Sequence, residues 1–256
     1  MKVCIFLGPT LDAAAARREL DAVILPPAAQ GDVYRAAQAR PLAIGIVDGY
    51  FEHVPSVWHK EILWAMSRGI HVYGAASIGA LRAAELSSFG MEGVGAVYEA
   101  FARGDLEDDD EVAVAHALAE DGYRPLSEPM VDIRSTLARA RAEGVIGEAT
   151  ERALVQVGKT LFYADRSYRA VLAGGEALGL PEGQLAGLRA FLAAGRVFQK
   201  RQDALAMLRL MRARLAEEPG PKRVRYTFAH TDAWERVRLE ALGPPRADER
   251  AGEACH

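Results

Sequence analysis

The sequence predicts an α/β protein, with a parallel sheet of about four strands flanked by helices in its N-terminal half and an all-helical C-terminal half. Two observations lead to this fold class. Short apolar runs alternate with longer helical segments through the first third of the chain, as in β-α-β units. From Ser127 onward, apolar residues instead recur at helical spacing.

Four continuous apolar runs are bounded by Gly, Pro or Asp, which is typical of strands buried on both faces of a parallel sheet. The predicted strands are residues 3–7, 22–25, 42–47 and 70–73. Between them lie segments 10–20, 32–40 and 57–68, each long enough for a crossover helix and each opened by a residue that can cap or start one. A helix is expected at 78–86, and the sheet is expected to end in the glycine-rich and acidic passage that follows.

The second half of the chain carries helical periodicity in two segments, up to Gly144 and through Leu154, Val157 and Leu161. A long basic amphipathic helix is expected at about 197–215. The residues after it are rich in Pro, Arg, Asp and Glu around one aromatic patch, a composition that orders poorly alone. These changes predict an α/β core at 1–125, a helical region at 126–217, and a flexible tail at 218–256 that could bind a partner.

The composition excludes several classes of protein. Lys+Arg 31 against Asp+Glu 35 gives a formal net charge of -4, so there is no basic excess to neutralise a run of phosphates, and a dedicated nucleic-acid binder is not expected. No apolar stretch approaches the roughly 20 residues that cross a bilayer, so no membrane segment is expected. Two cysteines, Cys4 and Cys255, form no disulfide framework or metal spacing, and we expect a cytoplasmic protein.

A single serine follows the last predicted strand in a run of small residues, GAASIGA at 74–80. Such a strand-turn-helix arrangement resembles a nucleophile elbow, in which a tight turn exposes the Ser77 hydroxyl and the N–H groups of Ile78 and Gly79 face an oxyanion. The match is partial, because Ala75 stands where the usual motif has Gly. Ser77 also sits where an N-cap belongs, so a purely structural role stays open.

A serine nucleophile needs a base, and His53, His59 and Lys60 follow the third predicted strand. No Ser-His-Asp order is evident. A lysine can act as the base when burial disfavours its charged form, and Lys60 lies between two tryptophans in the sequence. Lysine is scarce in this chain, where arginine, which stays protonated, is the usual basic residue. An exposed residue in the first turn of a helix remains the alternative.

Two further loops follow predicted strands and should share the sheet edge of Ser77, where ligands of open α/β sheets bind. They contain Gly8 and Thr10 after the first strand, and Asp48 and Gly49 after the third. We therefore expect these residues, together with His59, to contribute to substrate binding. Plain turn-forming roles are equally compatible with them. Neither loop has a phosphate-binding pattern.

Two charged segments are explained more simply by contact with solvent than by a binding site. The acidic run at 105–111 could hold a hard cation, with His116 beyond it, but it lacks metal-loop spacing and is expected to be a solvated turn. No metal is expected. The basic face of the helix at 197–215 is expected to be solvated rather than a docking site.

Several separated motifs resemble the TfuA-like family, in the family's order and over about residues 1–140. The matching segments are 6–10, 26–28, 31–32, 48–49, 58–63 (WHKEIL), 74–86 (GAASIGALRAAEL), 89–91 and 108–112 (DDDEV). At position 78 the chain has Ile where many relatives have Met.

The resemblance implies a partner of YcaO-type enzymes, which use ATP to activate a peptide backbone amide for replacement of its oxygen by sulfur. It further implies hydrolysis of the thiocarboxylated C-terminus of a ThiS-like, ubiquitin-fold carrier by a Ser-Lys pair, which maps onto Ser77 and Lys60. It also implies help in engaging the peptide substrate, and no cofactor of the protein's own, since the ATP belongs to the YcaO enzyme. A non-catalytic adaptor that docks the YcaO enzyme and a generic Ser-Lys hydrolase are the alternatives.

Overall fold

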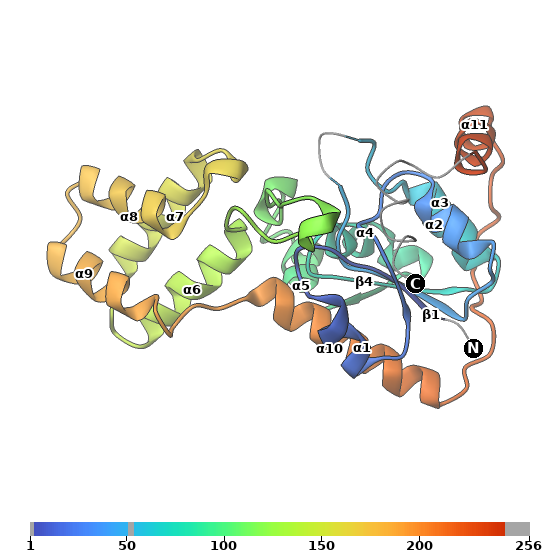
Figure 1. Ribbon diagram of the computed structural model, residues 1–256, viewed down its shortest axis with the longest axis horizontal. Helices are drawn as coiled ribbons and strands as arrows, with labels where there is room; N and C mark the ends of the chain where they lie inside the picture. Colours follow the sequence, from blue (N-terminus) through green and yellow to red (C-terminus); the bar gives the residue numbers. More distant parts are fainter. Residues whose placement is uncertain (1–2, 51–53, 244–256) are drawn as a thin grey trace. The chain divides into compact units, whose positions relative to one another are not determined.

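The computed structural model describes residues 3–50 and 54–243, and the chain divides into two compact units (Figure 1). The described residues of the first unit lie within 1–107, 118–123 and 201–256, and the second unit contains 108–117 and 124–200. The change of unit after Tyr123 lies close to the boundary predicted near 125, whereas the later boundary falls at 200 rather than near 217 and residues 108–117 join the second unit. The long helix at 199–216 contributes most of its length to the first unit, because its apolar side packs against the sheet.

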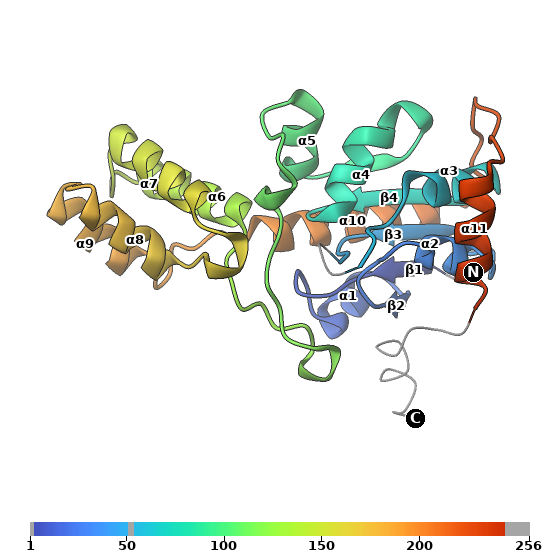
Figure 2. The same cartoon turned by 90° about the horizontal axis from the view of Figure 1, so that it is seen from above.

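A parallel sheet of five strands forms the centre of the first unit, which confirms the predicted α/β class (Figure 2). The strands are β1 (Val3–Phe6), β2 (Val23–Leu25), β3 (Ala43–Ile46), β4 (His71–Ala75) and β5 (Glu92–Val94), in the order β2-β1-β3-β4-β5. The direction of strand addition reverses between β1 and β3. In open α/β sheets such a switch point opens a crevice at the carboxyl ends of the strands.

The fifth strand was not predicted, because β5 reads Glu-Gly-Val and carries no apolar run. It pairs with β4 at the edge of the sheet. Its Gly93 lies against the ring of Tyr98, where a Cβ would come within 2.1 Å of ring carbons. Glycine is therefore kept here by close packing rather than by turn formation.

Helices cover both faces of the sheet, as the alternation of side chains along each strand requires. Ile5 of β1 packs with the helices on one face and Phe6 with those on the other. The helices of this unit are α1 (Ala13–Glu19), α2 (Asp32–Ala37), α3 (His59–Ser67), α4 (Ile78–Leu86), α5 (Ala96–Arg103), α10 (Gln199–Ala216) and α11 (Asp232–Ala241), with short 3-10 turns η1 (Ser87–Phe89) and η3 (Ala119–Asp121).

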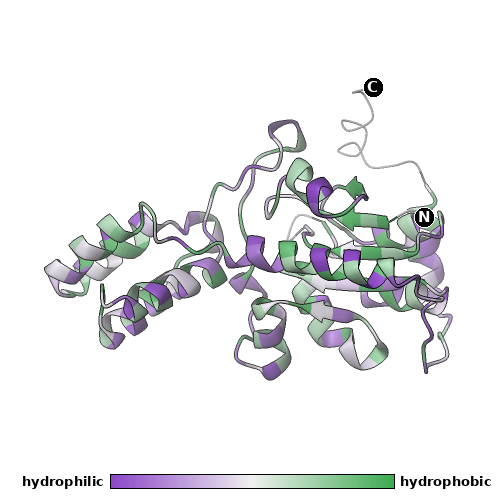
Figure 3. Cartoon of the chain, turned by 90° about the horizontal axis from the view of Figure 1, so that it is seen from below, coloured by the Kyte–Doolittle hydropathy of each residue, from purple (hydrophilic) through white to green (hydrophobic). Residues whose placement is uncertain are grey.

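Helix α10 lies on the same face of the sheet as α1 and mixes hydrophilic with hydrophobic residues along its length (Figure 3). Its Met207 and Met211 reach the sheet over Gly45, where a Cβ would meet both side chains within 3.1 Å. Its Arg209 pairs with Glu19 of α1 on the solvent side. The predicted amphipathic helix is present at nearly the expected position.

The second unit is helical, as the sequence predicts for this region. It consists of α6 (Met130–Ala142), α7 (Glu148–Thr160), α8 (Tyr168–Ala177) and α9 (Glu182–Phe191), with 3-10 turns η2 (Asp109–Glu111) and η4 (Tyr163–Asp165). Met130, Ile133 and Leu137 of α6 form its core with Leu154 of α7 and Leu185 of α9.

Part of the acidic run is paired with cations in the second unit rather than freely solvated. Asp110 accepts hydrogen bonds from Lys159 and from Arg166, which is itself only 1% exposed. Burial alone would raise the pKa of Asp110, but these hydrogen bonds outweigh it and lower that pKa. Glu111 accepts a two-pronged bond from Arg134. The carboxylates thus hold the turn against α6 and α7.

The segment predicted as a flexible tail contains helix α11 in its described part. Trp234 of α11 is fully buried among Tyr34, Trp64 and Phe228. The aromatic patch noted in the sequence therefore packs against α2 and α3. Cys255 lies outside the described residues. Within residues 3–50 and 54–243, we find no helix with the length and apolar character needed to span a membrane.

The start of α4 lies directly against the backbone of two strands. A Cβ on Gly79 would stand 1.8 Å from the carbonyl oxygen of Ile46, and one on Gly74 would stand 2.1 Å from the carbonyl oxygen of Gly79. Real Cβ atoms do not approach backbone this closely, so both positions require glycine. This contact fixes the turn between β4 and α4.

We expect Gly79→Ala to lower the free energy of unfolding by about 3 kcal/mol, because the added methyl group displaces α4 from the sheet. Gly183→Ala is the matched control, since Gly183 is likewise the second residue of its helix but has nothing near its Cβ position. There the substitution should stabilise by about 0.5–1 kcal/mol. Chemical denaturation measures both, and equal effects at the two positions would contradict the packing argument.

Candidate functional site

Ser77 follows a strained turn between β4 and α4. Ala76 has φ +67°, in the left-handed region that residues with a side chain rarely adopt. The Ser77 N–H donates to the carbonyl oxygen of Ala75 at 2.7 Å, which closes a three-residue turn. Strain of this kind persists only where surrounding structure imposes it, and it concentrates at functional sites. The predicted elbow-like turn is present, with its positive φ one residue before the serine.

The hydroxyl of Ser77 is not used as a helix cap. Ser77 occupies the N-cap position of α4, and its carbonyl oxygen accepts from the Ala80 N–H at 2.9 Å, but its side chain accepts no cap hydrogen bond. The residue is only 2% exposed. A serine kept for capping would bond an N–H of the first turn. The capping role therefore explains the position of Ser77 but not its hydroxyl.

The two N–H groups predicted to form an oxyanion hole differ in this structure. The Gly79 N–H donates to the carbonyl oxygen of Val47 at 3.3 Å and is therefore already engaged. The Ile78 N–H, at the start of α4, has no hydrogen-bond acceptor among the described residues. Of these two predicted donors, the Ile78 N–H is therefore the one available to an oxyanion.

Asp48 connects the other two predicted loops. Its buried carboxylate accepts from the Gly8 N–H at 2.9 Å, the Thr10 N–H at 3.1 Å and the Thr10 hydroxyl at 2.6 Å. Gly49 lies against Ile78, because a Cβ there would come within 2.6 Å of the Ile78 side chain. The structure therefore brings Gly8, Thr10, Asp48, Gly49 and Ile78 to one edge of the sheet, as expected for strands that end there.

His59 lies on the outer side of α3 and pairs with α4. Its Nε2 is 2.7 Å from Glu85 Oε2, and Arg82 Nη1 donates to the same oxygen at 2.8 Å. Burial would raise the pKa of Glu85, but the contacts with His59 and Arg82 outweigh it and lower that pKa. Arg82 also donates to the carbonyl oxygen of Val57. His59 is thus part of a hydrogen-bonded cluster, with Glu85 and Arg82, that ties α3 to α4.

Lys60 does not contact Ser77 in the described structure. Its Nζ donates to the carbonyl oxygen of Ala229 at 2.6 Å and to Oγ1 of Thr231 at 3.1 Å, and it lies 5.3 Å from the centre of the Phe228 ring. All three partners belong to the segment before α11. His53, the remaining candidate base, lies outside the described residues.

Glu61 is a buried titratable group that the sequence analysis did not single out. Its carboxylate accepts N–H bonds from Gly31, Tyr34 and Trp58, which begin helices α2 and α3. Burial raises the pKa of Glu61 to about 7 despite these three bonds. Glu61 bonds the N–H of Trp58 three residues before it, as the glutamate of a capping box does. Trp58 is not the Ser or Thr that marks this motif, so the sequence offered no signal for it.

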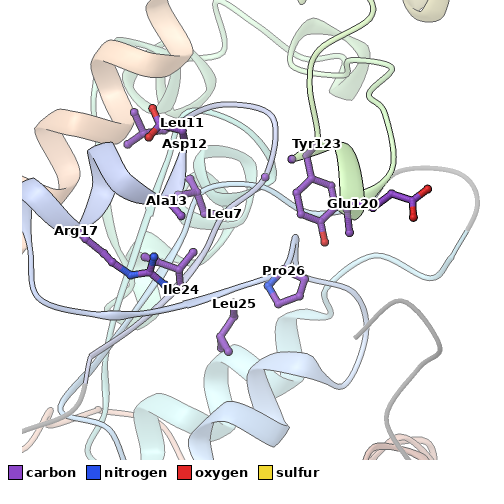
Figure 4. A pocket seen from close by; sticks show the side chains of 13 residues that line it. Leu7, Leu11, Asp12, Ala13, Arg17, Ile24, Leu25, Pro26, Glu120 and Tyr123 are labelled. Carbon is purple, nitrogen blue, oxygen red and sulfur yellow. The ribbon is translucent and has the colours of Figure 1, made fainter. Parts of the chain in front are cut away.

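A separate cavity of about 380 Å³ lies beside α1, between the ends of β1 and β2 and the turn at 119–123 (Figure 4). Leu7, Leu25 and Pro26 give it an apolar wall, and Tyr123 and Arg17 stand at opposite ends. It shares Gly8 with the candidate site, but neither Ser77 nor Lys60 lines it. Among the described residues, no cluster of His, Cys, Asp or Glu could hold a metal ion.

These features define a class: a doubly wound α/β protein with a serine on a strained strand-to-helix turn at the carboxyl edge of its sheet. Residues 48–167 match the family described as TfuA-like protein. The resemblance predicted from the sequence is thereby confirmed, and the chain carries a TfuA-like region that includes Lys60 and Ser77. The match begins at Asp48 and ends at 167, whereas the resemblance was expected over 1–140. A search of curated proteins found no match.

The pKa of Glu61 predicts a pH-dependent stability. The folded-state pKa of about 7 lies above its ordinary value of 4.5, so folding takes up a proton between these pH values. The stabilising contribution is full below about pH 4.5 and is lost as pH rises through about 7, by roughly 3 kcal/mol. We expect Glu61→Gln to flatten this slope in urea titrations at pH 5 to 8. An unchanged slope in the variant would assign the pH dependence to other groups.

Proposed function

We propose that the protein is a sulfur-delivery partner of a YcaO-type enzyme in peptide thioamidation. It hydrolyses a thiocarboxylated ThiS-like carrier and releases sulfide for its partner. The TfuA-like region supports the association with a YcaO-type enzyme. The proposal includes help in substrate engagement, a cytoplasmic location and no cofactor of the protein's own, since ATP is consumed by the partner.

The observation that best supports this proposal is the backbone strain beside Ser77 together with a hydroxyl that does not cap the helix. A strained turn holds it at the end of β4, and its hydroxyl makes no cap hydrogen bond, although it occupies the cap position. Close glycine packing makes the turn rigid, which suits a nucleophile that must keep its geometry through two chemical steps. The Ile78 N–H, at the start of α4, is a donor for the oxyanion.

The proposed reaction has two steps. Lys60, in its neutral form, takes the proton of the Ser77 hydroxyl as Oγ attacks the thiocarboxyl carbon and the C–Oγ bond forms. As the C–S bond breaks, Lys60 passes this proton to the departing sulfur, so that hydrosulfide (HS⁻) leaves and the amine is neutral again. Water, activated by the same amine, then attacks the ester. The C–Oγ bond breaks, Ser77 regains its proton, and the carrier leaves with an ordinary carboxylate.

The contacts of Lys60 favour a second candidate function. Its amine is bonded to Ala229 and Thr231 rather than to Ser77, which is what a non-catalytic adaptor would show. In that case the α/β unit would dock the YcaO-type enzyme, and Ser77 would serve the turn alone. A generic Ser-Lys hydrolase, the third possibility, would turn over small esters rapidly.

We expect Ser77→Ala to reduce sulfide release from a thiocarboxylated carrier by at least about 1000-fold, because the nucleophile is lost. Lys60→Arg should reduce it by at least about 100-fold, since arginine keeps the charge and the contacts but cannot accept the proton. Ser135→Ala is the matched control, as its hydroxyl donates to the carbonyl oxygen of Val131 within α6, in the other unit. Activity near that of the unchanged protein in either variant removes that residue from the mechanism.

A sulfur-source experiment separates the enzyme from the adaptor. With the YcaO-type partner, ATP and peptide present, we expect Ser77→Ala to support thioamidation from free sulfide but not from the carrier. The reason is that docking is retained while sulfide generation is lost. Mass spectrometry of the peptide detects the exchange of oxygen for sulfur. Equal modification by the variant with the carrier as the sole sulfur source would establish the adaptor.

A further inference from the structure

The segment that precedes α11 runs as an extended strap, residues 221–231, over the first unit. Its exposure alternates from 221 to 228, with every second residue partly covered by the protein. The covered residues are Lys222, Val224, Tyr226 and Phe228. This period of two is that of an extended chain lying on a surface.

The strap is anchored on both sides of its contact with Lys60. Before the contact, the Tyr226 hydroxyl donates to the carbonyl oxygen of Leu63 at 2.7 Å. After it, Trp234 inserts among Tyr34 and Trp64 and is fully buried. Between these anchors, residues 229–231 are exposed to solvent. Residues 229–231, the middle of the strap, are therefore held mainly by the hydrogen bonds that they accept from Lys60.

The strap supplies the hydrogen-bond partners of the Lys60 amine. The Ala229 carbonyl oxygen and Thr231 Oγ1 both accept from Nζ, and the face of the Phe228 ring lies nearby. All three interactions hold the amine at the strap. Thr231 Oγ1 also accepts from the Trp234 N–H, so one oxygen both caps α11 and holds Lys60.

We propose that the strap is an autoinhibitory element that holds the Lys60 amine in its own hydrogen bonds and away from Ser77 until a partner displaces it. This inference rests on the proposed function and names its regulation. The amine cannot take the Ser77 proton while it is held at the strap, because a general base must lie within hydrogen-bond reach of the proton that it accepts. Release requires only the exposed middle of the strap to move, which short exposed segments do at little energetic cost.

The Trp234 anchor of α11 has a feature that favours release of the strap. The Trp234 indole N–H is buried without a hydrogen-bond partner among the described residues. A buried unsatisfied donor lowers the stability of the docked state. Docking of α11 is therefore weaker than its aromatic contacts alone would make it.

Two substitutions at one position test the strap. Thr231→Val removes the side-chain acceptor, and Thr231→Asp keeps a cap for α11 while adding a charge that pairs with Lys60. We expect Thr231→Val to raise the rate of sulfide release from the thiocarboxylated carrier by about three- to tenfold, which corresponds to the net contribution of one typical hydrogen bond. Thr231→Asp should lower it. A fall with Thr231→Val, or equal rates in both variants, overturns the proposal.

A second measurement tests the contact between the strap and Lys60 without measuring catalysis. N-hydroxysuccinimide acetate acetylates neutral amines, and peptide mapping reports Lys60 relative to Lys159, whose amine is held by Asp108 and Asp110. We expect Lys60 to be acetylated several times faster in Thr231→Val and more slowly in Thr231→Asp. Ser167→Ala is the control, because it removes the cap of α8 without touching Lys60.

The outcomes distinguish the two proposals. If acetylation of Lys60 changes as expected while Ser77→Ala still releases sulfide, the strap holds Lys60 but the proposed function fails. If Ser77→Ala is inactive and acetylation of Lys60 is the same in all variants, the proposed function stands and the strap proposal fails.

Discussion

The direct contact between the start of α4 and the backbone of β3 and β4 is the constraint on which the candidate site depends. Gly74 and Gly79 permit it, since neither position has room for a Cβ. The contact forces the chain from strand to helix within two residues and puts Ala76 at positive φ. Ser77 therefore owes its position to main-chain packing, which is more rigid than a position set by side chains.

The neighbouring loops are held in place by buried carboxylates rather than by close backbone packing. A single buried carboxylate, Asp48, takes three hydrogen bonds from Gly8 and Thr10, and another, Glu61, takes three from the starts of α2 and α3. Each carboxylate replaces backbone acceptors that a regular element would supply. The loops at the edge of the sheet and the starts of α2 and α3 are thus ordered by acidic side chains that accept hydrogen bonds from backbone N–H groups.

The sequence predicted those features that depend on residues close to one another along the chain. Continuous apolar runs predicted β1 to β4, and small residues around Ser77 predicted the turn, because both follow from neighbouring residues. The β5 strand could not be found, since Glu92 and Gly93 are poor strand formers that pair only because β4 offers an edge. The partners of Lys60 could not be found either, because they lie 169 and 171 residues along the chain. Its apolar sequence neighbours pointed to a buried amine, yet the strap, not the core, surrounds it.

The aromatic cluster around α11 has an optical consequence. The chain contains three tryptophans, and Trp58, Trp64 and Trp234 all belong to this cluster. The helical second unit contains none. Tryptophan fluorescence of this protein, excited selectively over tyrosine, therefore reports on one corner of the α/β unit, and the second unit can unfold without changing it. A single fluorescence transition would describe only the first unit, while circular dichroism would include both.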